Sequence, residues 1–288
     1  MPKRKRVINM AHRGGAGVSP ENTIYAFSRA VGEYGADVIE MDVWLSSDGH
    51  PVVIHDPRVD RTTNATGKIY KMSLGEIKKC DAAYNFTTDG GMSYPLRGMG
   101  ITIPTLREVF ESLPGVRMNI EIQQVWPPAE EKIYDLIVKH GMQDLVLVAA
   151  KSHLVHKRFK AVNEAGIAVS ASIKQGMLFR VLSEMGLSRF YHPDVYAFQF
   201  PEKSRGLQVI TSEFIDAAHY HGIEVHAWII NEIKDMIKLL EIGVDGIITD
   251  YPDRLHKLLR GRYVQGCGGG NGRKKQNFAA YPAVIYPE

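Results

Sequence analysis

The sequence has 288 residues, of which 44% are hydrophobic and 23% are charged, and these proportions are typical of soluble globular proteins. Its formal net charge of +3 is too small to indicate a protein that binds nucleic acid or a membrane. The two cysteines, Cys80 and Cys267, provide neither a disulfide framework nor the spacing of a thiolate metal site.

The basic N-terminus, residues 3–6, resembles the start of a signal peptide, but the segment after it does not. The apolar stretch Val7–Ala11 is shorter than the ~7–15 residues of a signal's apolar region. No apolar run reaches the length of a transmembrane helix. We therefore expect a cytoplasmic protein with no integral membrane segment and no nucleic-acid partner, and the sequence leaves the oligomeric state open.

Short apolar runs alternate with amphipathic segments along the chain, which is typical of a parallel sheet covered by helices. The expected strands are Val7–Ala11, Val38–Leu45, Val52–His55, Arg117–Gln123, Leu145–Ala150, Ala168–Ile173, Val195–Phe200, Glu224–Ile230 and Gly246–Asp250. The expected helices include Glu21–Tyr34, Pro128–Lys139, Leu154–Ala165, Met177–Met185, Ser212–His221 and Ile233–Glu241. About eight such units in ~250 residues predict an α/β fold, a closed (β/α)8 TIM barrel, with an open doubly wound sheet as the alternative.

The sequence predicts nine strands, one more than an eight-stranded barrel needs, and the extra strand lies in the first third of the chain. Val38–Leu45 and Val52–His55 are separated by a short segment that contains Asp48-Gly49, and this dipeptide between apolar runs predicts a hairpin. A turn centred there places Asp42 opposite His55, within a slip of one or two residues. The hairpin then extends the second barrel strand beyond the rim and returns His55 to the mouth.

Two segments depart from the alternation of strands and helices. Residues 57–103 are rich in Thr, Gly, Asp and Met, with a weak helical pattern near Leu74–Tyr84. We interpret them as a small insertion over the barrel mouth that affects substrate choice, with a disordered loop as the alternative. Pro104-Thr105-Leu106 then opens a helix through Ser112. The expected barrel domain spans residues 1–260, and residues 261–288 are expected to form a Gly-rich tail.

A histidine and an arginine follow the first expected strand directly. His12-Arg13-Gly14-Gly15 places a proton-transfer group beside a fixed cation, and the glycines let a ligand approach the backbone. His55 ends the hairpin's second strand, so it is expected at the same mouth. Two histidines that face one phosphate can act as general base and general acid, so His12 and His55 are the candidate catalytic pair.

Three carboxylates are expected at the same rim. Glu40 and Asp42 lie two residues apart on one strand and so share a face, and Glu121 lies among isoleucines on the next long strand. Buried carboxylates are costly unless they are paired or bind a metal, and an all-oxygen set favours a hard divalent cation, Mg²⁺ or Ca²⁺. An ion pair with Arg13 is the alternative for any one of them.

An ordered set of motifs over about residues 7–258 resembles the glycerophosphodiester phosphodiesterase family. These motifs are His12-Arg13-Gly14, Glu21-Asn22-Thr23, Glu40-Met41-Asp42-Val43, Asp48-Gly49, His55-Asp56, Arg61-Thr62-Thr63, Ile103-Pro104-Thr105-Leu106, Asn119-Ile120-Glu121-Ile122, Val225-His226-Ala227-Trp228 and Gly243-Val244-Asp245-Gly246-Ile247-Ile248-Thr249-Asp250-Tyr251-Pro252. The resemblance implies a barrel of the phospholipase C-like type. It also implies metal-dependent hydrolysis of glycerophosphodiesters to glycerol 3-phosphate and an alcohol.

The resemblance further implies what each matching residue does. His12 and His55 are the acid/base pair and Arg13 is a phosphate ligand. The divalent cation is held by Glu40, Asp42 and Glu121. The site is supported by Glu21 and Asn22, and its glycerol pocket is lined by Trp228.

The chain departs from the family's usual pattern in three segments. The family usually has lysine where this chain has Gln123, and it tends to have Ser-Phe where this chain has Ala150-Lys151. A glutamine can hydrogen bond a phosphate but brings no charge, so we expect Lys151 to supply the missing cation. The family's Trp-Thr-Val-Asn reads Trp228-Ile229-Ile230-Asn231 here, which removes a hydroxyl.

These departures put the natural substrate in question. The expected function is hydrolysis of glycerophosphodiesters. The alternatives are a related phosphodiesterase that acts on lysophospholipids or phosphoinositides and a catalytically silent barrel that binds phosphodiesters.

Overall fold

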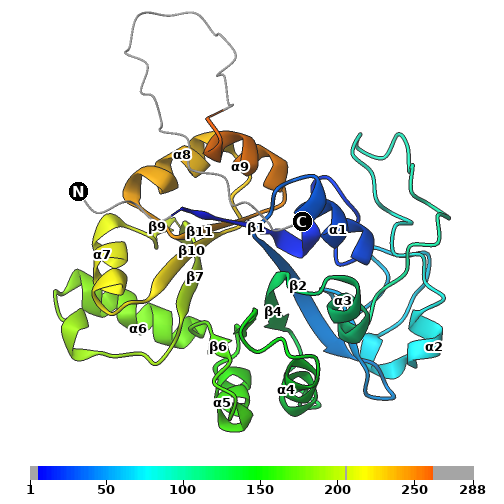
Figure 1. Ribbon diagram of the computed structural model, residues 1–288, viewed down its shortest axis with the longest axis horizontal. Helices are drawn as coiled ribbons and strands as arrows, with labels where there is room; N and C mark the ends of the chain where they lie inside the picture. The colour runs from blue at the N-terminus through cyan, green and yellow to red at the C-terminus, as the bar shows by residue number, and fades with distance from the viewer. Residues whose placement is uncertain (1–5, 205, 262–288) are drawn as a thin grey trace, which may run out of the picture.

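A computed structural model describes residues 6–204 and 206–261 (Figure 1). Its strands are β1 (Ile8–Ala11), β2 (Val38–Leu45), β3 (Pro51–Val53), β4 (Arg117–Ile122), β5 (Val146–Ala149), β6 (Ala168–Val169), β7 (Ala197–Pro201), β8 (Lys203–Ser204), β9 (Leu207–Gln208), β10 (Glu224–Trp228) and β11 (Gly246–Thr249). Its α-helices are α1 (Ile24–Gly32), α2 (Leu74–Ile77), α3 (Leu106–Ser112), α4 (Glu130–Lys139), α5 (His153–Val162), α6 (Ile173–Glu184), α7 (Ser212–Tyr220), α8 (Ile233–Ile242) and α9 (Pro252–Leu259). Short 3-10 turns are η1 (His12–Gly14), η2 (Ile69–Lys71) and η3 (Ser188–Phe190).

Eight parallel strands form a nearly closed barrel, which confirms the predicted (β/α)8 fold class over the open sheet. The strand order is β6-β5-β4-β2-β1-β11-β10-β7. A parallel bridge between Ser170 and Ala197 joins the two ends of that order. The helices form the outer ring around the strands (Figure 1).

The apolar faces of strands and helices pack together in two large clusters. One cluster joins β1, β2, β4 and β5 to α1, α3, α4 and α5, and it includes the fully buried rings of Phe27 and Phe159. The other joins β7, β10 and β11 to α6, α7, α8 and α9 around Phe179, Phe198 and Phe214. Burial of these side chains stabilises the frame from which the strand ends project.

The β2–β3 hairpin differs by one residue from the predicted register. Val43 pairs with Val53, and the amide of Ile54 donates to the carbonyl oxygen of Asp42 at 2.9 Å. Asp42 therefore lies opposite Ile54, and His55 follows the end of β3 instead of lying within a strand. The difference falls within the slip that the turn sequence allowed.

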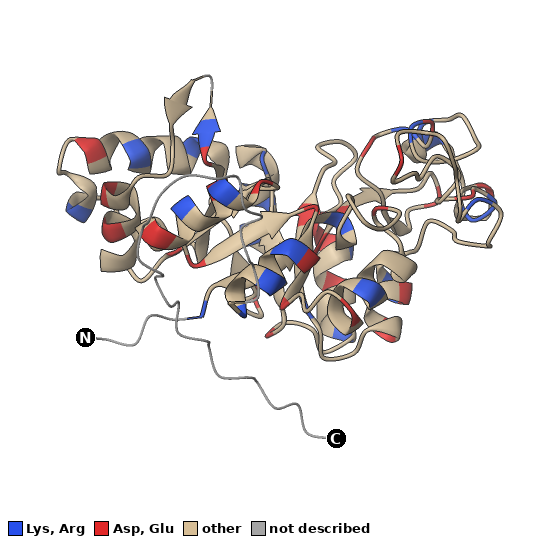
Figure 2. Ribbon diagram, turned by 90° about the horizontal axis from the view of Figure 1, so that it is seen from above, with Lys and Arg blue, Asp and Glu red and all other residues tan. Residues whose placement is uncertain are grey.

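Residues 57–103 pack on a small apolar core of their own, which excludes the alternative of a disordered loop. Val59, Ile69 and Ile77 from this segment are buried together with Val52 of β3. Only α2 forms where a weak helical pattern was expected near Leu74–Tyr84. Figures 1 and 2 place the segment beside the barrel on the side of β2 and α3.

The largest boundary error lies at β6. A strand was predicted over Ala168–Ile173, but β6 ends at Val169 and α6 begins at Ile173. Ser172 and Gln175 form a capping box that starts α6 four residues earlier than the predicted Met177. Within residues 6–204 and 206–261, every helix is too short or too polar to cross a lipid bilayer. The predicted tail lies outside the described residues from position 262 onward.

Candidate active site

The turn after β1 places His12 and Arg13 at the carboxyl end of the barrel. Arg13 has φ 51°, in the left-handed region, and its backbone N–H donates to Oε2 of Glu40 at 2.8 Å. Gly14 follows with φ 84°, and a Cβ there would lie 2.8 Å from the side chains of Ala26 and Phe27. The glycine therefore lets the turn lie directly on α1, which holds the two side chains at the rim.

His12 is held by a carboxylate from the last barrel strand. Its Nδ1 lies 2.6 Å from Oδ1 of Asp250, which follows β11, the neighbour of β1 in the barrel. Asn231 donates from Nδ2 to Oδ2 of Asp250 at 2.7 Å and accepts from the Asp250 amide at 2.9 Å. Burial favours the neutral ring, but the hydrogen bond to Asp250 and the charge of Glu40 outweigh it and raise the pKa of His12.

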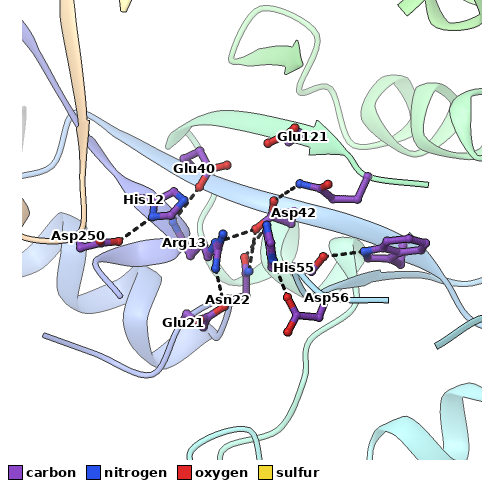
Figure 3. Close-up of polar contacts among 12 residues, drawn as sticks. His12, Arg13, Glu21, Asn22, Glu40, Asp42, His55, Asp56, Glu121 and Asp250 are labelled. Carbon is purple, nitrogen blue, oxygen red and sulfur yellow. Dashed lines mark hydrogen bonds and ion pairs between the residues drawn. The ribbon is translucent and has the colours of Figure 1, made fainter. Parts of the chain in front are cut away.

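His55 is held in the same way from the other side of the site. Its Nδ1 lies 2.6 Å from Oδ1 of Asp56, and Arg61 donates to Oδ2 of Asp56 at 2.6 Å. The indole N–H of Trp44 donates to the carbonyl oxygen of His55 at 2.9 Å. Figure 3 shows the His55 ring beside Asp42. Each histidine therefore has one ring nitrogen bound to an aspartate, which sets the orientation of the ring.

Glu40, Asp42 and Glu121 converge as their spacing predicted. Asp42 and Glu121 are Cα partners on the neighbouring strands β2 and β4. One carboxylate oxygen from each of the three residues lies within 4.8 Å of the other two. Burial, with the charge of Asp42, raises the pKa of Glu40. Burial also raises the pKa of Glu121, although the charge of Lys151 opposes that shift. Crowded carboxylates of this kind fit a hard divalent cation.

Arg13 lies among carboxylates and links the turn to two of them. Its Nε is 3.2 Å from Oδ2 of Asp42 and its Nη1 donates to Oε1 of Glu21 at 3.0 Å. Arg61 also donates to both oxygens of Glu21 at 2.7 Å. Burial opposes ionisation of Glu21, but the bonds from Arg61 and the charge of Arg13 outweigh it and lower its pKa. Glu21 therefore anchors both guanidinium groups.

Two amide side chains hold Asp42. Asn22 donates to its Oδ2 at 3.0 Å from below the site. Gln123 donates to its Oδ1 at 2.5 Å from the position directly after β4. Gln123 contacts a candidate metal ligand in the structure, and its expected contact with the substrate stays a prediction.

A cleft opens at the strand ends beside these groups. Six of the predicted site residues line it: His12, Arg13, Glu40, Glu121, Lys151 and Trp228. Lys151 is half exposed, with its Nζ 3.1 Å from Oε1 of Glu121 and 5.9 Å from the centre of the Trp228 ring. The lining contains no described residue from the insertion, which reaches the site through Arg61.

Three partners in the site were not predicted: Asp250, Asp56 and Arg61. All three stand within quoted motifs. The contacts of Asp250 with His12 and of Arg61 with Glu21 join segments far apart in the chain, whereas Asp56 is next to His55. The contact of Asp250 with His12 could have been predicted from one feature: Asp250 follows the strand that neighbours β1 in a closed barrel. That neighbour relation follows only after the topology is known.

Known proteins resemble this chain in sequence and in fold. A model described as the glycerophosphoryl diester phosphodiesterase family matches residues 12–254. A glycerophosphodiester phosphodiesterase from Caldanaerobacter subterraneus subsp. tengcongensis is 35% identical over 260 residues, which cover 88% of this chain and 98% of that protein.

Solved structures match over a similar range. A glycerophosphoryl diester phosphodiesterase domain from Mycobacterium tuberculosis superposes with a TM-score of 0.79 at 20% identity, over 88% of this chain and 99% of that chain, and this likeness shows the fold. An Oleispira antarctica phosphodiesterase in complex with the product sn-glycerol-3-phosphate has a TM-score of 0.68 at 28% identity, over 88% of this chain and 96% of that chain. The chain belongs to the glycerophosphoryl diester phosphodiesterase family.

Proposed function

We propose that this protein hydrolyses glycerophosphodiesters to glycerol 3-phosphate and an alcohol, with His12 and His55 as the acid/base pair and a divalent cation on three carboxylates. One observation supports this proposal most strongly. Two histidines, each with Nδ1 bound to an aspartate, flank a group of carboxylates at the rim of a barrel of this family.

The two histidines perform the proton transfers. Asp250 and Asp56 hold Nδ1 of His12 and His55, and no described residue hydrogen bonds to Nε2 of either ring. Nε2 is therefore the atom that exchanges a proton in both rings. One histidine removes a proton from the attacking hydroxyl, and the other protonates the leaving oxygen. Loss of the alcohol then needs no strong external acid.

Glu40, Asp42 and Glu121 would hold the cation, Mg²⁺ or Ca²⁺. Their oxygen donors suit a hard cation, and burial raises the pKa values of Glu40 and Glu121, a cost that a bound cation would offset. When bound, a divalent cation supplies positive charge against the phosphate oxygens. Asn22 and Gln123 keep Asp42 oriented toward that position.

The remaining groups bind the substrate. Arg13 and Lys151 offer two positive charges to the phosphate's non-bridging oxygens, and Glu21 keeps Arg13 in place. Trp228 provides an apolar wall for the glycerol carbons. The product sn-glycerol-3-phosphate in the Oleispira antarctica relative supports glycerol 3-phosphate as the group that this site retains.

The proposal is tested with glycerophosphocholine as substrate and phosphorus NMR as the readout of products. We expect glycerol 3-phosphate and choline in the presence of Mg²⁺ or Ca²⁺, and no turnover after chelation. Release of phosphocholine and glycerol would contradict the proposed bond cleavage. Absence of turnover with either cation for every glycerophosphodiester tried would favour the silent binding barrel.

A further inference from the structure

The barrel interior below the rim of the cleft contains polar side chains that the proton transfers and the candidate cation site do not use. Asn119 on β4, Ser170 directly after β6 and Gln199 on β7 all line the cleft. Asn119 and Ser170 are each only 2% exposed. We call these three residues the polar floor. Polar side chains are costly in a buried place unless they form hydrogen bonds, so the polar floor is suited to a polar ligand.

Asn119 has an unpaired atom in this floor. Its Oδ1 is buried and has no hydrogen-bond partner among the residues that the structure describes. Asn119 lies two residues before Glu121 on β4, so both side chains face the barrel interior, and Asn119 lies ~7 Å deeper along the strand. An unpaired buried acceptor is destabilising, and a hydroxyl that reaches this depth would satisfy it.

Gln199 is held by a chain of hydrogen bonds that decides which end of its amide faces the cleft. Its Nε2 lies 3.2 Å from Nδ1 of His226, and Nε2 of His226 lies 3.1 Å from Oε2 of Glu224. An ionised carboxylate only accepts, so the neutral His226 ring donates from Nε2 and accepts at Nδ1. Gln199 therefore donates to His226 and keeps its carbonyl oxygen, Oε1, for the cleft.

A glycine makes room for the His226 ring. A Cβ at Gly246 would lie 2.9 Å from Cδ2 of His226 and 3.1 Å from Cε of Met10. Gly246 and His226 are Cα partners on β11 and β10, and His226 is 1% exposed, so the ring packs against the backbone of β11. A side chain at position 246 would displace the ring and, with it, the amide of Gln199.

The depth of the polar floor decides which part of a glycerophosphodiester can reach it. In the proposed function, the phosphate on C3 of glycerol lies at the rim, beside Arg13 and Lys151. Within the glycerol, the hydroxyl on C1 is the polar group farthest from that phosphate, so it extends deepest into the barrel. Gln199 and Asn119 each present an amide oxygen there, and a hydroxyl can donate to such an oxygen.

We infer that Gln199 and Asn119 form a subsite for the C1 hydroxyl of glycerol and make the enzyme select substrates that carry it. The hydroxyl donates to Oε1 of Gln199 and contacts the amide of Asn119. His226 is a positioning residue, because it acts only through Gln199. This inference rests on the proposed function and adds residues that determine the specificity of the same site.

The test compares glycerophosphocholine with its 1-deoxy analogue, propane-1,2-diol 3-phosphocholine, which keeps the phosphate, the choline and the C2 hydroxyl. We call the ratio of the two kcat/KM values the hydroxyl preference. We expect a preference of about 100-fold, because the analogue leaves the buried amide oxygens unpaired. A preference below about threefold would show that the polar floor does not read this hydroxyl and would overturn the inference.

Variants of the polar floor test the two residues directly. Gln199→Met and Asn119→Leu remove the amides with little change in side-chain size, and each should reduce the hydroxyl preference about tenfold. Gln143→Met is the matched control, since Gln143 is a half-buried glutamine that precedes β5 at the opposite end of the barrel. It should leave the preference unchanged. An unchanged preference in both folded floor variants would also overturn the inference.

Two substitutions of His226 test its positioning role. His226→Leu removes the acceptor for Gln199 and should lower the hydroxyl preference about fivefold. His226→Asn retains an acceptor near the position of Nδ1 and should keep the preference within about twofold of the parent protein. A purely structural role would lower kcat/KM equally for both substrates in both variants, and that result would contradict the positioning role.

The two proposals fail in different ways. Hydrolysis of glycerophosphocholine and of the 1-deoxy analogue at similar kcat/KM would overturn the hydroxyl subsite and leave the proposed function standing. Absence of hydrolysis of both substrates would overturn both proposals.

Discussion

Oδ1 of Asp250 lies 2.6 Å from Nδ1 of His12, although the two residues are 238 positions apart in the chain. Asn231 fixes the other oxygen of Asp250 by donating to it at 2.7 Å. Asp250 therefore has one oxygen committed to Asn231 and one to the histidine. An ionised carboxylate can only accept a hydrogen bond, so a neutral His12 ring in this contact carries its proton on Nδ1.

Asp250→Asn should reverse the preference of the His12 ring proton for Nδ1 over Nε2. Asn231 still donates to residue 250, so the new amide oxygen turns to Asn231 and the new NH₂ group turns to Nδ1 of His12. Nδ1 must then accept, which moves the ring proton to Nε2. We expect kcat to fall about 10²- to 10⁴-fold, as measured by steady-state release of glycerol 3-phosphate.

The control for this variant is Asp135→Asn, on the exposed face of α4. It removes the same charge far from the cleft and should leave kcat unaltered. A kcat for Asp250→Asn within about twofold of the parent protein would show that the aspartate does not orient a catalytic ring.

Lys151→Met should weaken substrate binding. The Lys151 ammonium lies in the cleft beside Glu121 and near the Trp228 ring, where it can meet a phosphate oxygen. Loss of one partly exposed charge-assisted hydrogen bond should raise KM about fivefold to tenfold. Lys157→Met, exposed on α5, is the control and should have no effect. An unchanged KM in Lys151→Met would rule out Lys151 as a phosphate ligand.

His156 should make the fold sensitive to acid. It is 3% exposed on α5, and burial, helped by the charge of Lys160, lowers its pKa from 6.5 to about 4. The folded state keeps the ring neutral while the unfolded chain protonates it. Its contribution to stability is therefore complete above pH 6.5 and is lost as the pH falls from 6.5 toward 4.

His156→Phe should remove this acid sensitivity. Urea unfolding at pH 7.5 and at pH 5.0 measures the free energy of unfolding of both proteins. The parent protein should lose ~2 kcal/mol more than the variant between the two pH values. His50→Gln, at an exposed position of the hairpin, should behave like the parent protein. If His156→Phe and the parent protein lost equal free energy of unfolding between pH 7.5 and pH 5.0, His156 would not be the source of the acid sensitivity.

Local sequence patterns predicted the barrel elements well where one signal dominated. β2 has the predicted bounds Val38–Leu45, because its apolar run ends at a segment that contains Asp48-Gly49. α6 began earlier than predicted, since Ser172 and Gln175 form a capping box. Periodicity alone did not reveal this start, because Val169, Ala171 and Ile173 continue the alternating apolar pattern of a strand up to the first residue of the helix.

The site was predictable only in part, because local sequence patterns do not show which distant residues meet in the folded protein. His12 stands out by its place directly after a strand, and Glu40 and Asp42 stand out because they share one face of β2, and all three lie close together in the structure. The contacts of Asp250 with His12 and of Arg61 with Glu21 depend on tertiary folding. The contact of Gln123 with Asp42 also joins two strands, and the sequence around Gln123 carries no local signal for it.

The central claim is that His12 and His55 carry out the two proton transfers. The most direct measurement is kcat for His12→Ala and for His55→Ala on glycerophosphocholine with saturating divalent cation, with circular dichroism to check that each variant folds. We predict that each variant folds and loses nearly all turnover, about 10²- to 10⁴-fold. Substantial turnover in either folded variant would contradict the account.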